Sequence, residues 1–321
     1  MIQVIIENIF IMFVFISIGF SLRKKYVMDD HVTKGISKIL LNVAIPAAII
    51  SSMLSTPFET YILINLGLMV GIMILSFTFF TFFGVFIAKV LKLEHSKVGI
   101  YACSIAFANS VFMGTPIVSS IWGDTGVFYI AIANIPFFTL LTLFTNMFIK
   151  GTDEQLVKKK FKLDSGIIAS LIGLLLYIFQ DLIPMIILDL IRPHSVDGIG
   201  GGVIGRILFQ LGQLMTPISM FFIGSSLGKN KISDVSFDRN MYILIFIKLI
   251  FAPVLLFFVT RIFINDSTLL GVLVLKTAMP TAALVAIFAE KKNSDAIYSS
   301  QIIFVTTLFS LFTIPLITLL L

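Results

Sequence analysis

The stretch ANSVFMGTPIVSS (residues 108–120) places an amide, several hydroxyls, a glycine and a proline inside a long apolar run. In a membrane helix, a proline removes one backbone hydrogen bond, and a neighbouring glycine makes unwinding easier. The freed peptide groups are costly in lipid unless protein, water or a ligand satisfies them. The stretch therefore predicts a helix that is broken beside a cavity, with a simple packing kink as the alternative.

The composition is that of a protein that crosses a membrane many times. Of the 321 residues, 58% are hydrophobic and 12% are charged, and the mean hydropathy is +1.06. An ordinary soluble domain is about 25% charged. A bilayer accepts apolar surface around a whole helix bundle, whereas a soluble core of this size does not. We therefore expect a lipid bilayer as the surroundings and no nucleic-acid partner, although the net charge is +6.

Ten apolar segments are long enough to cross the hydrocarbon core as helices, which takes about 20 residues each. The predicted spans are 2–22, 35–55, 61–91, 98–121, 126–149, 166–190, 204–227, 241–263, 269–290 and 297–321. The first span carries its positive cluster at its C-terminal end, unlike a secretory signal, so we expect it to remain in the mature protein.

The distribution of lysine and arginine predicts the orientation, because short loops rich in these residues stay in the cytoplasm. The connections after spans 1, 3, 5, 7 and 9 hold 18 of the 23 basic residues, and the opposite connections hold only Arg192, Arg206 and Arg261. We expect a multi-pass protein of the plasma membrane with both termini outside the cytoplasm. The excess of lysine over arginine indicates a prokaryotic source.

Ten spans divide into two five-helix repeats, 1–149 and 166–321, joined by a charged cytoplasmic linker at 150–165. Because five is odd, the second repeat is inverted relative to the first, a common plan of secondary carriers. Asn42 and Gln213 each stand four residues before a proline in matching spans. Counted from the start of each half, Pro116 and Pro280 occupy nearly the same position. The predicted fold is thus all-α, with helices 4 and 9 broken.

Two lysines fall inside predicted spans. Lys276 lies about 12 Å into the ninth span at 1.5 Å per residue, four residues before Pro280. A cation at this depth marks a functional site by default, here a partner for an anionic substrate. The alternative is a lysine satisfied by backbone carbonyls released at the break. The role of Lys248, in the eighth span, stays open.

No carboxylate falls at the middle of a predicted span, since Glu7, Asp181 and Asp189 all lie toward the outer ends. A coupling ion, either H⁺ or Na⁺, would therefore be held by carbonyls, amides and hydroxyls. No catalytic triad or metal-ligand pattern is present, so we expect neither an enzyme nor a bound cofactor. Asn134, also near a proline, is expected to bridge helices. The motifs GLMVG (67–71) and GSSLG (224–228) favour close helix packing.

The chain resembles the auxin efflux carrier family of membrane transporters, whose bacterial members include malate and malonate permeases. The resemblance covers the whole chain. It is most specific in ANSVFMGTP and in TAMPTAALVAIFAEKKNSDAIYSSQIIFVTTLFSLFTIPLITLL, and extends to LLNVAIPAAIISSMLSTPF and PISMFFIGSSLG.

The resemblance implies a fold like that of sodium/proton antiporters or bile-acid symporters, with helices 4 and 9 crossing at their prolines. Helices 1, 2, 6 and 7 would form a scaffold, helices 3–5 and 8–10 would form the transport bundle, and the protein would be a homodimer. The expected substrate is a small organic carboxylate anion such as malate, malonate or an auxin-like acid. The residues expected to bind it are Asn42, Asn109, Gly114, Thr115, Pro116, Gln213, Lys276, Pro280 and Thr281. The alternatives are a sensor or receptor on a carrier fold and a sodium-coupled symporter.

Overall fold

The computed structural model describes residues 2–150, 165–192, 202–229 and 237–321. Within these ranges every secondary-structure element is a helix, apart from an isolated antiparallel bridge between Ala108 and Thr281. The predicted linker at 150–165 lies outside the described residues except for its two ends. The all-helical prediction is confirmed.

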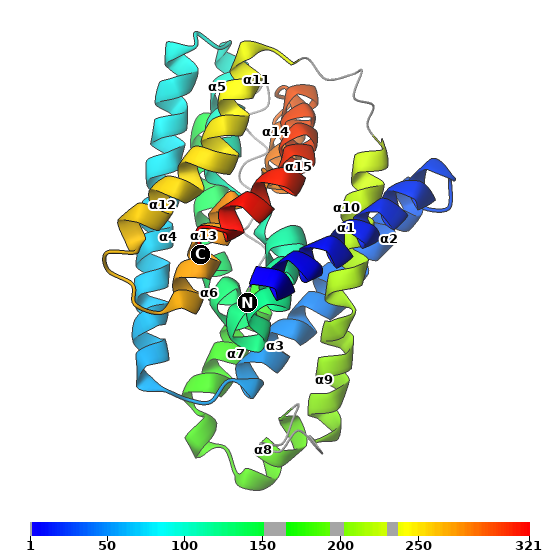
Figure 1. The fold of residues 1–321 in the computed structure, drawn as a ribbon, viewed down its shortest axis with the longest axis vertical. Coiled ribbons are helices and arrows are strands. Elements are labelled where there is room, and N and C mark those ends of the chain that lie inside the picture. The colour runs from blue at the N-terminus through cyan, green and yellow to red at the C-terminus, as the bar shows by residue number, and fades with distance from the viewer. Residues whose placement is uncertain (1, 151–164, 193–201, 230–236) are drawn as a thin grey trace. The chain divides into compact units, whose positions relative to one another are not determined.

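The chain forms two compact units, and each unit draws on both halves of the sequence. The first unit contains Met1–Leu68, Val111–Ile135 and Lys162–Lys229, and the second contains Met69–Ser110, Pro136–Phe161 and Asn230–Leu321. Two long helices, α4 (Thr60–Val90) and α6 (Thr115–Phe148), contribute to both units. Figure 1 gives the course of the chain through them.

Among the described residues, the first unit contains nine helical elements besides its parts of α4 and α6. Its elements are α1 (Ile2–Lys24), α2 (Asp30–Ile39), the π-helix η1 (Leu40–Ala44), α3 (Ile45–Ser55), α7 (Ser165–Ile178), η4 (Gln180–Leu182), α8 (Met185–Ile191), α9 (Val203–Gln213) and α10 (Met215–Lys229).

The second unit also contains interrupted helices. Its elements, besides its part of α4 and α6, are α5 (His95–Ala106), α11 (Arg239–Phe246), the π-helix η6 (Ile247–Phe251), α12 (Ala252–Thr260), α13 (Ser267–Ala278), α14 (Ala283–Lys291) and α15 (Ala296–Thr318). A further π-helix, η2 (Ser110–Gly114), joins α5 to α6 at the border between the two units.

Six helical runs in the described ranges are long and apolar enough to cross a membrane, judged by length and composition. They are Asp30–Ser55, Thr60–Val90, Ser110–Phe148, Val203–Lys229, Arg239–Thr260 and Ala296–Thr318. Ser165–Ile178 and Ser267–Ala278 are shorter apolar helices. The predicted spans 166–190 and 269–290 are thus interrupted, which is why no single helix there reaches the full length. The protein is a multi-pass, all-helical membrane protein.

Gly123 separates the predicted spans 98–121 and 126–149. Its φ of 57° and ψ of −140° are non-helical and lie in a region that a residue without a Cβ adopts at little cost. The long helix α6 therefore consists of a short part before Gly123 and a long part after it.

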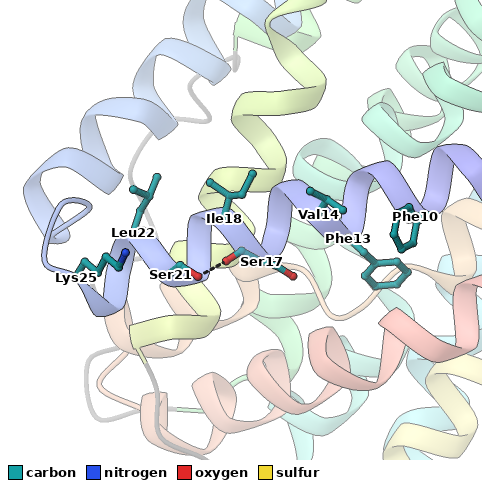
Figure 2. A pocket seen from close by; sticks show the side chains of 8 residues that line it. All are labelled: Phe10, Phe13, Val14, Ser17, Ile18, Ser21, Leu22 and Lys25. Carbon is teal, nitrogen blue, oxygen red and sulfur yellow. Dashed lines mark hydrogen bonds between the residues drawn. The ribbon is translucent and has the colours of Figure 1, made fainter.

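The face of α1 shown in Figure 2 carries a row of apolar side chains with a row of polar ones, Ser17, Ser21 and Lys25, beside it. Phe10, Val14 and Ile18 are 67%, 42% and 41% exposed, as expected for side chains that face lipid tails. With Ser17, Ser21 and their neighbours they line a shallow groove of about 480 Å³. The Ser21 Oγ donates a hydrogen bond to the Ser17 carbonyl at 2.8 Å, which satisfies the hydroxyl within its own helix.

Within the first unit, α1 packs closely along α10, as Figure 1 shows. A Cβ added at Gly224 would collide with the carbonyl oxygen of Ile16, and one added at Gly19 would collide with the backbone of Phe221. The expected packing role of GSSLG is confirmed. At GLMVG the described part of the chain forms no such contact, since an added Cβ at Gly67 or Gly71 meets no atom within 4 Å.

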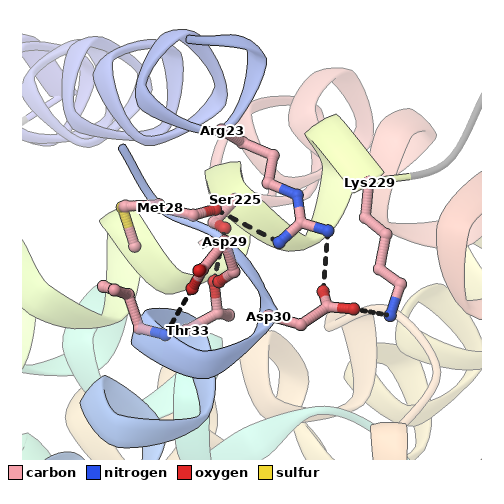
Figure 3. A network of polar contacts seen from close by, with 8 residues as sticks. Arg23, Met28, Asp29, Asp30, Thr33, Ser225 and Lys229 are labelled. Carbon is pink, nitrogen blue, oxygen red and sulfur yellow. Dashed lines mark hydrogen bonds and ion pairs between the residues drawn. The ribbon is translucent and has the colours of Figure 1, made fainter. Parts of the chain in front are cut away.

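An ion-pair network joins the ends of α1, α2 and α10 (Figure 3). Asp30 accepts from Arg23 Nη2 at 2.7 Å and from Lys229 Nζ at 3.1 Å. The hydroxyls of Thr33 on α2 and Ser225 on α10 also lie 2.8 Å apart. The ion pairs are largely exposed, so each contributes at most about 1 kcal/mol, and their main effect is to fix the register of the three helix ends.

The glycine contacts predict a clear contrast between two single substitutions. Gly224→Ala should lower the free energy of unfolding by about 1–3 kcal/mol, because the new methyl group collides with backbone that cannot rotate away. Gly67→Ala should leave it unchanged or raise it by up to about 1 kcal/mol through helix propensity. Chemical unfolding in detergent measures both. Equal effects of the two substitutions would contradict the α1–α10 contact.

Candidate functional site at a helix crossover

Two helices of the second unit stop and restart at the same place. α5 ends at Ala106, and its cap residue Phe107 has φ −102° and ψ 118°. α13 ends at Ala278, and its cap residue Met279 has φ −61° and ψ 150°. Both chains thus leave the helical conformation and become extended before the next helix begins.

The two extended segments pair with each other as a two-residue antiparallel bridge. The Asn109 amide nitrogen donates to the Pro280 carbonyl at 2.7 Å, and the Ala282 amide nitrogen donates to the Phe107 carbonyl at 3.0 Å. Ala108 and Thr281 stand opposite each other between these bonds. Four of the peptide groups freed by the breaks therefore satisfy one another inside the protein.

Pro280 explains why α13 ends where it does. A helix would pair the Lys276 carbonyl with the amide of residue 280, but proline has no N–H to donate. The Met279 amide takes this carbonyl instead, in a tighter turn at 3.4 Å. The sequence prediction of a break at this proline is therefore confirmed in position.

Side-chain hydroxyls and an ammonium group satisfy the next carbonyls. Thr281 Oγ1 donates to the Ser104 carbonyl at 2.9 Å, one turn before the end of α5. The Thr281 amide donates to Thr306 Oγ1 at 3.2 Å, so it is no longer directed at Thr277. The Thr277 carbonyl accepts from Lys248 Nζ at 3.3 Å. Tertiary partners thus replace helical ones on both sides of the crossing.

The expectation that both helices cross at their prolines is wrong for helix 4. The crossing residue there is Ala108, eight residues before Pro116. Pro116 stands in the first turn of α6, where its missing N–H would be unpaired in any case. Gly114 and Thr115 flank the same helix start and, with Pro116, belong to the first compact unit. The residue opposite Ala108 is Thr281, so Pro280, but not Pro116, lies next to the bridge.

The buried charged side chains among the described residues are three lysines, all in the second unit. Lys248 is 0% exposed, Lys276 1% and Lys292 6%. No aspartate or glutamate is buried in the described part of the chain. The charge-bearing side chains described in the interior of this unit are therefore all basic.

Lys276 lies against an aromatic cluster. Its Nζ is 5.7 Å from the centre of the Phe77 ring and 5.6 Å from that of Phe137. Both rings contact Phe107, the residue at the end of α5, with centroids 5.1 and 5.8 Å away. Aromatic faces attract a cation and replace part of the hydration it has lost. A neighbouring lysine, Lys248, donates to a carbonyl released at the break.

Lys292 was counted as a loop lysine, but it is buried and has a structural partner. Its Nζ donates to the carbonyls of Thr145, Asn146 and Ile149 at 2.8, 3.1 and 3.1 Å. These carbonyls lie at the C-terminal end of α6, where a helix offers its negative end to a cation.

The predicted site residues belong to two different compact units. Asn109, Lys276, Pro280 and Thr281 meet at the crossover of the second unit, and Asn109 is the one of these four that is partly exposed. Asn42 and Gln213 are exposed residues of the first unit. The Asn42 side chain donates to the Lys38 carbonyl at 2.8 Å, within its own helix.

Sequence reasoning missed Ser104 and Thr306, which take part in the hydrogen bonds of the crossover. Hydroxyl residues are common in membrane helices and usually bond within their own helix. Thr306 also does this, donating to the Ile302 carbonyl at 2.7 Å, so its sequence carried no sign of a second partner.

Comparison with known proteins agrees with the geometry. The family model described as "Membrane transport protein" matches residues 4–166 and 155–318. The chain belongs to this family. The resemblance to auxin efflux carriers is therefore confirmed at the level of the family. The family model covers both sides of the crossover, including α5, α13 and the bridge between them.

A relative from Methanothermobacter thermautotrophicus, described as an "Uncharacterized transporter", is 22% identical over 318 residues. The match covers 97% of this chain and 96% of the relative. Family and relative are both described as transporters, which is consistent with the expectation that the protein is not an enzyme.

The crossover predicts different effects for two substitutions of Thr281. Thr281→Val should lower the free energy of unfolding by about 1–3 kcal/mol, because the buried Ser104 carbonyl loses its donor. Thr281→Ser keeps the hydroxyl and should stay close to the wild type. Thermal or chemical unfolding of the purified protein in detergent distinguishes them, and identical values for the two variants would exclude this hydrogen bond.

Proposed function

We propose that the protein is a secondary transporter of small organic carboxylate anions, working by alternating access around the helix crossover. The observation that carries the proposal is a crossing of two broken helices in a unit whose buried charged side chains, among the described residues, are all lysines. Broken helices mark the binding sites of many carriers, because their free ends offer hydrogen bonds and partial charges to substrates and ions. Buried lysines, with no carboxylate buried among the described residues, favour an anion over a cation as the substrate.

A membrane topology of ten spans in two inverted repeats is part of the proposal. A nearly constant shift supports it: the bridge partners Ala108 and Thr281 are 173 residues apart, and the starts of α5 at His95 and α13 at Ser267 are 172 apart. Asn42 and Gln213 are 171 apart. The loop charges favour termini outside the cytoplasm in the plasma membrane.

The division of the chain supports a scaffold and a transport bundle. The first unit contains α1, α2, α3 and α7 to α10, which correspond to the predicted helices 1, 2, 6 and 7. The second unit contains α5 and α11 to α15 with parts of α4 and α6. We propose that the second unit carries the substrate and the first anchors the protein in the bilayer.

Asn109 is the residue of the crossover best suited to contact a substrate directly. Its backbone nitrogen is held by Pro280, which fixes the position of its side chain near the bridge. The Asn109 side chain is only half-buried, and the structure describes no hydrogen bond of its side-chain amide. An amide can donate to a carboxylate and accept from a hydroxyl, as a hydroxy acid or a half-protonated diacid requires.

Transport by purified protein in proteoliposomes tests the proposal. Labelled malate, malonate and indole-3-acetate are supplied outside, and we expect at least one to accumulate in excess over empty vesicles. Asn109→Ala should reduce this uptake at least tenfold if its amide supplies about 1.4 kcal/mol or more of substrate binding. Saturable binding of these acids without any uptake would instead identify a sensor on a carrier fold.

Lys276 gives a second prediction, on binding affinity. Lys276→Met should weaken the binding of dicarboxylates by about 1–3 kcal/mol. Methionine fills about the same volume as lysine but lacks the positive charge that attracts a carboxylate. Lys291→Met, at an exposed lysine fifteen positions further on, is the matched control and should bind as the wild type does. Isothermal titration measures both, and equal affinities in the two variants would remove Lys276 from the substrate site.

A further inference from the structure

The Thr277 carbonyl is an unusual acceptor, because it stands at the end of a half-helix inside the protein. In an unbroken helix it would accept from the amide of Thr281, which donates to Thr306 Oγ1 instead. The last carbonyls of α13 also carry the negative end of the helix dipole. In carriers, carbonyls of this kind at the ends of broken helices coordinate the coupling cation.

In this protein a lysine reaches that carbonyl. Lys248 Nζ donates to it at 3.3 Å from η6, a π-helical turn between α11 and α12. Ile247, Lys248 and Leu249 are all buried, so the turn directs three consecutive residues into the unit. Wide turns of this type are rare and concentrate at functional positions.

No buried carboxylate is described near the Lys248 side chain. η6 packs on α5, α13 and α15, and none of the buried residues described on these helices is a carboxylate. The nearest elements offer hydroxyls, carbonyls and the buried Lys276. The partner described for the Lys248 side chain is therefore the carbonyl at the negative end of α13.

We propose that the Lys248 ammonium is a built-in cation of the crossover, occupying the place at the end of α13 where other carriers bind a metal ion. The inference rests on the proposed function, since it concerns the coupling of the same crossover. It follows that the protein needs no Na⁺ to stabilise its broken helix, and that transport proceeds equally well without it. Lys248 is a positioning residue: it holds the end of α13 and does not contact the substrate.

The first test uses the wild-type protein and needs no substrate. Thermal unfolding of the purified full-length protein is measured in NaCl, KCl and choline chloride at equal ionic strength. We expect the same midpoint in all three salts, because the carbonyl already has a cation. A midpoint that rises with Na⁺ specifically would overturn the proposal, since an ion that binds the native state raises its stability.

The second test removes the ammonium group in two ways. Lys248→Ala leaves a space into which Na⁺ or propylammonium fits, and either ion should raise its midpoint by a few degrees over choline. Lys248→Met fills the space without a charge, and its midpoint should be below that of the wild type in every salt. Lys291→Met, at the exposed position, should match the wild type throughout.

Each result decides the proposal independently of transport. A Lys248→Met protein as stable as the wild type would overturn it, because the charge would then be unnecessary. Folded Lys248→Ala protein that responds to neither cation would overturn it as well. If the wild type moves malate, uptake should be equal in NaCl and choline chloride; failure of uptake altogether would count against the proposed function and leave the unfolding results standing.

Discussion

A peptide group inside a bilayer has no water to bond with, so every interruption of a helix requires a partner from elsewhere in the protein. The second unit meets this requirement by placing two interruptions against each other. The amides of Asn109 and Ala282 and the carbonyls of Phe107 and Pro280 exchange hydrogen bonds across the bridge. Inside a bilayer, either break alone would leave backbone N–H and C=O groups without partners. The two helices therefore depend on each other for their shape.

The remaining polar groups follow from this arrangement. Because Thr281 is pulled into the bridge, its hydroxyl reaches the Ser104 carbonyl and its amide reaches Thr306. That in turn releases the Thr277 carbonyl to Lys248. A substitution at one of these positions therefore changes the hydrogen bonds available to the neighbouring positions. The effects of two such substitutions on stability should not be additive.

Much of the fold could be predicted from the sequence, because apolar runs and loop charges are local signals. The break in helix 9 was predictable too, since Pro280 cannot donate to the Lys276 carbonyl. The break in helix 4 was misplaced because no residue at Phe107–Asn109 forbids a helix. The bridge to α13 imposes it, while Pro116 fits the first turn of α6. Counting from the start of each half paired Pro116 with Pro280, whereas in the bridge Ala108 stands opposite Thr281.

The three bonds of Lys292 have a mechanical consequence. They fasten the end of α14, one half of the broken helix, to the final turn of α6. Separating the two helices would leave a buried ammonium group and three carbonyls without hydrogen-bond partners, which costs free energy. If α14 moves during the transport cycle, the C-terminal end of α6 must therefore move together with it.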